Sequence, residues 1–158
     1  MKKLSFPAFL VLLVLIFTML PGCQMSRMPI SANEFKTRAE AAGYFVQDAL
    51  DQFPEGAAET YLIAFVGGDA IEYQIEFAVT STTEQAVSAY RQNRSDFEAQ
   101  KGSFSSDTSV SVGNYSYYKL TSNGKYSVIS RIENTFIYVN APAEHKDAIV
   151  EFLNSIGY

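Results

Sequence analysis

The chain has 158 residues, of which 47% are hydrophobic and 18% charged, and its formal net charge is −5 at pH 7. This length suits one domain, and the acidic balance argues against nucleic acid as a partner, because phosphate binding needs clustered cations. A single cysteine, Cys23, excludes an intramolecular disulfide, and a single histidine, His145, leaves little basis for a His/Cys metal site or a Ser–His relay.

The N-terminal segment has the pattern of a secretory signal peptide. Two lysines follow the initial methionine, and the chain from Leu4 to Leu20 is almost wholly apolar. This apolar segment has 17 residues, which is close to the lower limit of about 17 for a membrane-spanning helix, so length alone does not exclude an uncleaved anchor. In either case the positive-inside rule places the remainder of the chain outside the cytoplasm.

The residues Leu20-Pro21-Gly22-Cys23 resemble the bacterial lipobox, which has a branched apolar residue three positions before the cysteine and a small residue directly before it. The resemblance implies a diacylglycerol on the Cys23 sulfur and cleavage before Cys23, so that residues 1–22 are the signal peptide. Pro21 is a less usual residue at its position, which implies less efficient processing. Two acyl chains anchor a protein stably. We therefore expect an extracytoplasmic lipoprotein held on a bacterial membrane by diacylglyceryl-Cys23.

The mature chain that this cleavage leaves has 136 residues, with ten basic and 17 acidic side chains and a net charge of −7. That charge argues against an electrostatic hold on anionic lipid. Residues 23–30 are the lipidated cysteine and a short tether, and residues 31–158 are a single domain for which no cofactor or metal is expected. The tether from Gln24 to Ile30 reaches at most about 25 Å, so the domain is expected to work close to the membrane.

The first half of the domain is expected to hold one helix and three strands. A helix is expected over residues 32–42, because Ser31 and Glu34 have the spacing of a capping box and Gly43 supplies a stop. Three strands follow at 44–46, 61–66 and 71–79. The last of these alternates apolar and polar residues, as a strand with one buried face does. The segment from Asp48 to Ala58 is left open.

A second helix is expected over residues 83–100, with a capping box at Thr82 and Gln85. A Ser-rich loop over 103–111 follows, with an extra strand at 110–112 as an open alternative. Strands are then expected at 115–121, 125–132 and 135–140. The Asn123-Gly124 pair predicts a type I′ hairpin between the first two of these, because both residues tolerate positive φ.

Pro142 suits the first position of a last helix. We expect His145 to lie on the solvated outer face of that helix. The predicted order is α-β-β-β-α-β-β-β-α, and the many hairpins predict an α+β fold with a mainly antiparallel sheet and helices packed on it. Residues 61–90 and 126–152 each combine a hairpin with a helix, and whether this is an internal repeat is left open.

The tyrosines of the C-terminal strands are the first candidate site. Tyrosine combines apolar area with a hydroxyl, so it suits an interface or a sugar-stacking surface. Cross-strand aromatic pairing within the sheet is the alternative explanation. The candidate binding residues are Tyr115, Tyr117, Tyr118, Tyr126 and Tyr138. The Ser-rich loop is expected to contribute to the same surface.

Glu72 and Glu76 are the second candidate site, because alternation places both on one face of a strand, roughly 7 Å apart. Such spacing suits the paired carboxylates of sugar hydrolysis. Alternating glutamates also keep a half-exposed strand soluble, which is the alternative explanation.

The sequence favours a non-catalytic binding or accessory domain, with an envelope protein or a glycan as the partner. Two alternatives stay open: a cell-envelope hydrolase that uses carboxylates, and a structural protein that self-associates. The ligand and the oligomeric state are left undetermined by the sequence.

Overall fold

The computed structural model describes residues 26–52, 55–68 and 70–158. The expected signal peptide and Cys23 therefore lie outside the described residues. The helices are α2 (Ala32–Ala41), α3 (Thr83–Ala99) and α4 (Lys146–Ser155), with short 3₁₀ helices at Leu50–Gln52 and Ala143–His145. The strands are β1 (Phe45–Asp48), β2 (Thr60–Gly67), β3 (Ile71–Val79), β4 (Ser105–Val112), β5 (Tyr115–Ser122), β6 (Lys125–Ile132) and β7 (Thr135–Pro142).

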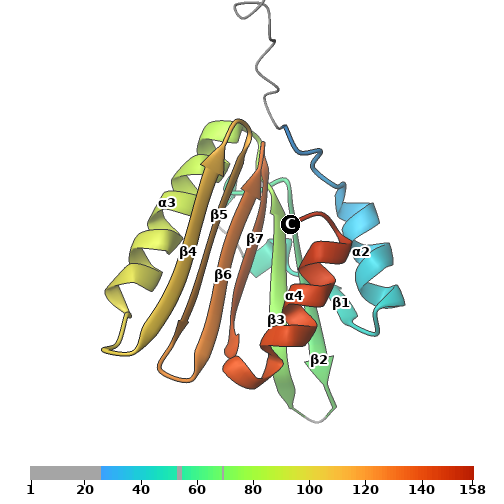
Figure 1. Cartoon of the computed structure of the whole chain (residues 1–158). Coiled ribbons are helices and arrows are strands. Elements are labelled where there is room, and N and C mark those ends of the chain that lie inside the picture. Colours follow the sequence, from blue (N-terminus) through green and yellow to red (C-terminus); the bar gives the residue numbers. More distant parts are fainter. Residues whose placement is uncertain (1–25, 53–54, 69) are drawn as a thin grey trace, which may run out of the picture.

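The strands of the described residues form one seven-stranded sheet in the order β1-β2-β3-β7-β6-β5-β4, and every pairing is antiparallel. Helices α2 and α4 cover one face, and α3 covers part of the other (Figure 1). The prediction of an α+β fold with an antiparallel sheet is confirmed. Residues 61–90 and 126–152, which each combine a hairpin with a helix, place their helices α3 and α4 on opposite faces of the sheet.

The predicted element order is wrong at one place, because four strands and not three follow α3. Residues Ser105–Val112, expected as a loop apart from 110–112, form the edge strand β4 and pair with β5 along their whole length. All eight residues of β4 are exposed, so no buried apolar face marks them in the sequence. Backbone hydrogen bonds to β5, and not side-chain burial, define this strand.

The local signals for caps and turns are largely confirmed. Thr82 and Gln85 form both bonds of the expected capping box at the start of α3. At α2, Ser31 accepts from the Glu34 N–H at 3.1 Å, but the Glu34 side chain accepts from Arg38. Asn123 and Gly124 have φ angles of +52° and +74°, as the type I′ hairpin requires.

The start of the last helix differs from the prediction. Pro142 ends β7, a 3₁₀ turn follows, and α4 begins at Lys146. His145 therefore lies before α4, where it is half-buried and its ring stacks on Tyr73 with centroids 4.7 Å apart. The expectation of a solvated histidine on the helix is wrong, because the turn directs this residue onto the sheet.

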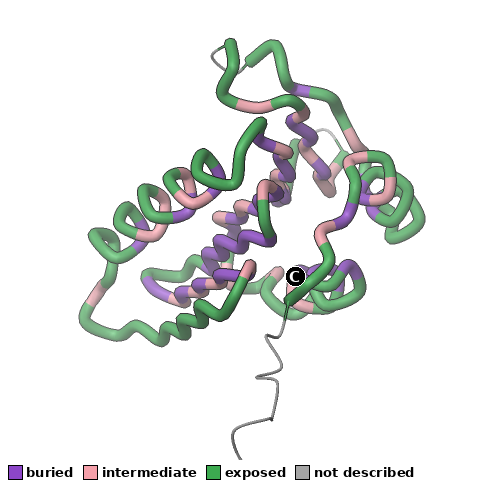
Figure 2. Tube along the Cα trace, turned by 90° about the horizontal axis from the view of Figure 1, so that it is seen from above, coloured by how far each residue is buried: buried purple, intermediate pink, exposed green. Residues whose placement is uncertain are grey.

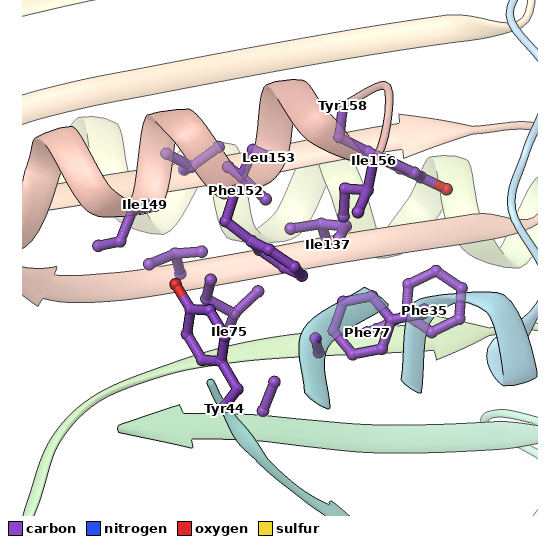
Figure 3. Packing of buried hydrophobic residues seen from close by; sticks show 14 of the residues in the cluster. Phe35, Tyr44, Ile75, Phe77, Ile137, Ile149, Phe152, Leu153, Ile156 and Tyr158 are labelled. Atoms are coloured by element: carbon purple, nitrogen blue, oxygen red, sulfur yellow. The ribbon is translucent and has the colours of Figure 1, made fainter. Parts of the chain in front are cut away.

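The larger core lies between the sheet and helices α2 and α4 (Figures 2 and 3). Phe35 of α2 stacks on Phe77 of β3, with ring centroids 4.6 Å apart, and meets Phe152 of α4 edge-on at 6.0 Å. These rings join both helices to the centre of the sheet. A smaller core lies under α3, where Phe97 and Tyr90 pack on side chains of the opposite sheet face.

Replacing Phe77 by alanine is expected to lower the free energy of unfolding by about 3–5 kcal/mol, because Phe77 is fully buried and its ring fills the space between α2 and β3. The matched control is Phe104→Ala, since the Phe104 side chain is 95% exposed. This control is expected to change the free energy by less than about 0.5 kcal/mol. Urea denaturation of both variants checks the result, and equal losses would contradict the assignment of the core.

Candidate functional site

A cavity of about 170 Å³ lies between α3 and the sheet, and we call it the Glu76 cavity. Its walls come from β2, β3, β7, α3 and residues 57–58. Small side chains create the space, since Ala78 of β3 and Ala89 of α3 both line it. A cavity of similar size with apolar walls is large enough for a benzene-sized molecule.

Alternation along β3 places Glu76 in this cavity. Its neighbours Ile75 and Phe77 are buried in the larger core on the opposite face, so Glu76 faces α3. The carboxylate is half-buried and held from two sides. Gln74 Nε2 donates to Oε1 at 2.9 Å, and the Tyr61 hydroxyl donates to Oε2. These bonds fix the orientation of the carboxylate and leave it further lone pairs for a ligand.

Tyr138 of β7 forms the wall beside this carboxylate, because the β3–β7 register pairs Glu76 with Tyr138. The Tyr138 ring stacks on Phe97 of α3, with centroids 5.3 Å apart. The Tyr138 hydroxyl is protonated at neutral pH, since the ordinary pKa of tyrosine is about 10 and burial raises the pKa of Tyr138 further. The cavity thus combines apolar walls with one oriented carboxylate and one neutral hydroxyl.

The structure separates the two predicted carboxylates. Glu72 lies on the same strand but is exposed, and it does not line the cavity that contains Glu76. Glu76 is the one acidic side chain among the described lining residues. Hydrolysis of a glycosidic bond generally uses a pair of carboxyl groups, so this arrangement suits binding better than that chemistry.

The five predicted tyrosines lie on both faces of the sheet. Tyr115, Tyr117 and Tyr126 belong to the core under α2 and α4, whereas Tyr118 and Tyr138 belong to the core under α3. Tyr118 and Tyr126 are fully buried. The five side chains therefore do not form one continuous surface, and only Tyr138 lines the Glu76 cavity.

Tyr61, Ala89 and Asn93 also line this cavity, although no pattern in the sequence predicted them. Tyr61 lies opposite Ala78 in the β2–β3 register, which brings its ring beside the small residue. Ala89 and Asn93 are four residues apart on α3, and the Asn93 amide donates to the Ala89 carbonyl at 2.9 Å. The pairing register that brings these residues together is not evident from the sequence alone.

The chain is held on the domain from Arg27 onward. The Arg27 N–H donates to Asn114 Oδ1 at 2.9 Å, and Asn114 Nδ2 donates to the Arg27 carbonyl at 2.7 Å. The Arg27 guanidinium donates to the Gly157 carbonyl at 3.0 Å and lies over the Tyr115 ring at 3.8 Å from its centroid. These contacts join the start of the domain to the β4–β5 turn and to the C-terminus.

No group of three or more His, Cys, Asp or Glu side chains among the described residues is arranged to hold a metal ion. Within the same part of the chain, no helix combines the length and the apolar character needed to cross a membrane.

No protein-family model matches the chain, and no curated protein matches it in sequence. Among solved structures, the extracellular domain of PknH from Mycobacterium tuberculosis is similar with a TM-score of 0.38 and 8% sequence identity. This similarity covers 81% of the present chain and 92% of the other. A likeness at this level carries no argument about the function of the chain.

The stability of the domain is expected to fall as the pH rises above about 10. Burial is the main cause that raises the pKa of Tyr61 well above its ordinary value, and the hydrogen bond to Glu76 is the second cause. Burial is also the main cause that raises the pKa of Tyr44 and of Tyr158. Above the ordinary tyrosine pKa the unfolded chain loses protons that the folded chain retains. Each such tyrosine therefore lowers the free energy of unfolding by about 1.4 kcal/mol per pH unit.

Urea denaturation between about pH 8 and pH 11 measures this effect, and tyrosinate absorbance follows the ionisation directly because the chain has no tryptophan. Tyr61→Phe is expected to reduce the alkaline slope. A stability that is constant over this range would contradict the prediction.

Proposed function

We propose that this chain is a membrane-anchored extracytoplasmic lipoprotein whose single domain binds a small ligand without converting it. The observation that carries the binding role is the Glu76 cavity, which has mostly apolar walls and one carboxylate held by Tyr61 and Gln74. The anchor rests on the lipobox resemblance at Leu20–Cys23.

The cavity chemistry favours a ligand with a small apolar body and a hydrogen-bond donor, such as an amine. The apolar body would fill the space beside Ala78 and Ala89, and the donor would meet the Glu76 carboxylate. An ammonium group would form a charge-assisted hydrogen bond there, which is stronger than a neutral one. An anionic group would meet repulsion from Glu76 in the same position.

The hydrolase alternative receives less support, since no second acidic side chain lines the Glu76 cavity within the described residues. One observation supports the alternative of self-association through the sheet edge. Strand β4 exposes all of its residues, and Val110 and Val112 are among them. This edge stays a hypothesis for a contact between copies of the chain.

The contacts of Arg27 support a close attachment to the membrane. If Cys23 carries the lipid, the chain from Cys23 to Arg27 spans at most about 14 Å when fully extended. This is shorter than the full tether from Gln24 to Ile30. The end of the domain with the β4–β5 turn and the C-terminus would then face the membrane (Figure 1).

The ligand proposal is tested with benzylamine and benzoate, which share a ring and differ in charge. Benzylamine is expected to shift the NMR signals of the Ala78 and Ala89 methyl groups, whereas benzoate is not, because of the Glu76 carboxylate. Glu76→Gln is expected to weaken benzylamine binding roughly tenfold. The control Glu72→Gln removes the same charge from the same strand outside the cavity and is expected to leave binding unchanged.

Equal binding of the two probes, or an equal effect of the two glutamate substitutions, would argue against the site. Hydrolysis of cell-envelope glycan that is lost in Glu76→Gln would contradict the non-catalytic role and favour the hydrolase.

The anchor is tested with Cys23→Ser, which removes the one cysteine thiol of the chain and with it the group that would carry the diacylglycerol. The variant is expected to keep residues 1–22 and to lose its lipid. Mass spectrometry and partitioning into the detergent phase measure the two changes, with Gln24→Ser as the control. Unchanged cleavage together with unchanged partitioning would show that Cys23 is not the anchor.

A further inference from the structure

A second and larger cavity, of about 360 Å³, lies on the other side of α3, and we call it the Arg131 cavity. It is bounded by α3, β4, β5 and β6. The two cavities share no lining residue, because Ala89 and Asn93 of α3 line the first while Arg91 and Arg94 line the second. The Arg131 cavity therefore needs a chemical explanation of its own.

Arg131 is a buried cation without an acidic partner. Only 6% of its surface is exposed. Its Nη1 donates to the Glu133 carbonyl at 3.0 Å and its Nη2 to the Ser116 hydroxyl at 3.3 Å. Its Nε is buried and has no hydrogen-bond partner, and no described side chain forms an ion pair with this guanidinium. A buried charge in this condition is costly unless an anion compensates it.

The surrounding charges are also positive. Arg91 and Arg94 line the same cavity, so three of the five arginines of the chain meet there. The one acidic side chain among the described lining residues, Glu98, accepts from Arg94 at 3.0 Å. The cavity thus holds a net positive charge in a chain whose formal net charge is −5. Such local concentration of cations attracts small anions.

The Arg131 cavity also presents hydroxyl groups. Ser116 Oγ lies 3.1 Å from Ser111 Oγ and accepts from Arg131, so the two serines and the guanidinium form one connected polar group. A planar guanidinium with a free N–H matches the oxygen pairs of carboxylate and phosphate groups, and serine hydroxyls donate to the same oxygens.

We propose that the Arg131 cavity binds the oxyanion group, carboxylate or phosphate, of a small solute. Arg131 attracts the oxyanion with its guanidinium, whose Nε–H has no partner within the described residues, and Arg91 supplies a second positive charge. A volume of about 360 Å³ exceeds that of an inorganic anion, so the solute carries additional atoms beyond the oxyanion. This site is independent of the Glu76 cavity, which favours the opposite charge.

The test uses the full chain in a nonionic detergent and inorganic phosphate as the probe, with chloride at matched ionic strength as the reference. Phosphate is expected to shift the NMR signal of the Arg131 Nε–H, which is identified by its absence in the spectrum of Arg131→Lys. Acetate is expected to shift the same signal. The absence of a shift with both phosphate and acetate would overturn the proposal.

Two substitutions decide whether the cavity is responsible. Arg131→Gln is expected to weaken phosphate binding roughly tenfold or more. Because a change at a buried residue can disturb folding, Arg91→Gln serves as a second variant at an exposed position of the same cavity and is expected to weaken binding several-fold. Arg38→Gln is the control, since Arg38 lies on α2 and pairs with Glu34. An equal loss in Arg38→Gln and Arg91→Gln would show a general charge effect and overturn the site.

These outcomes are separate from those of the benzylamine experiment. Phosphate acts on arginines around β6 and α3, whereas benzylamine acts on a glutamate of β3, so either site can fail while the other is retained.

Discussion

Pairing between β3 and β7 joins the two halves of the chain at the middle of the sheet, and both cores depend on its register. The register sets Phe77 opposite Ile137 and Glu76 opposite Tyr138. Because side chains alternate along a strand, the first pair faces α2 and α4 while the second faces α3. A shift by one residue would place Glu76 in the aromatic core and remove Phe77 from it. The same pairing thus sets the packing of the aromatic core on one face and the position of the Glu76 carboxylate on the other.

The two faces are covered to different extents, and this difference creates the cavities. Two helices pack against the sheet on the face of the larger core, where Phe35 and Phe152 fill the space between them. On the opposite face α3 is the one long helix among the described residues, and it packs on β5, β6 and β7. Cavities of opposite charge character lie along its two flanks. A single helix over a wide sheet therefore leaves space for a cavity on each of its flanks.

The sequence predicted those features that depend on local chemistry. The capping box at Thr82 and the Asn123-Gly124 hairpin were predicted because each is set by neighbouring residues. Strand β4 was missed because its pairing with β5 buries none of its side chains. Glu76 was identified from alternation, but its contact with Tyr61 depends on the pairing of β2 with β3. Arg131 lies in β6, where residues facing both sides of the sheet are buried, so alternation gave no sign of its position under α3.

The proposed lipid anchor and the proposed anion site lie at the same end of the domain, where the chain enters it. Ser111, Ser116 and Arg131 each lie two residues from a residue of the β4–β5 or β6–β7 turn, and Asn114 of the first turn binds Arg27. If Cys23 carries the lipid, this end lies close to the membrane, so the Arg131 cavity would lie nearer the bilayer than the opposite end of the sheet. The overall negative charge of the domain would repel an anionic bilayer surface, while the local positive charge would retain a small oxyanion solute. With the net charge and the local charge separated in this way, one domain would stay off the lipid headgroups and still bind an anion beside them.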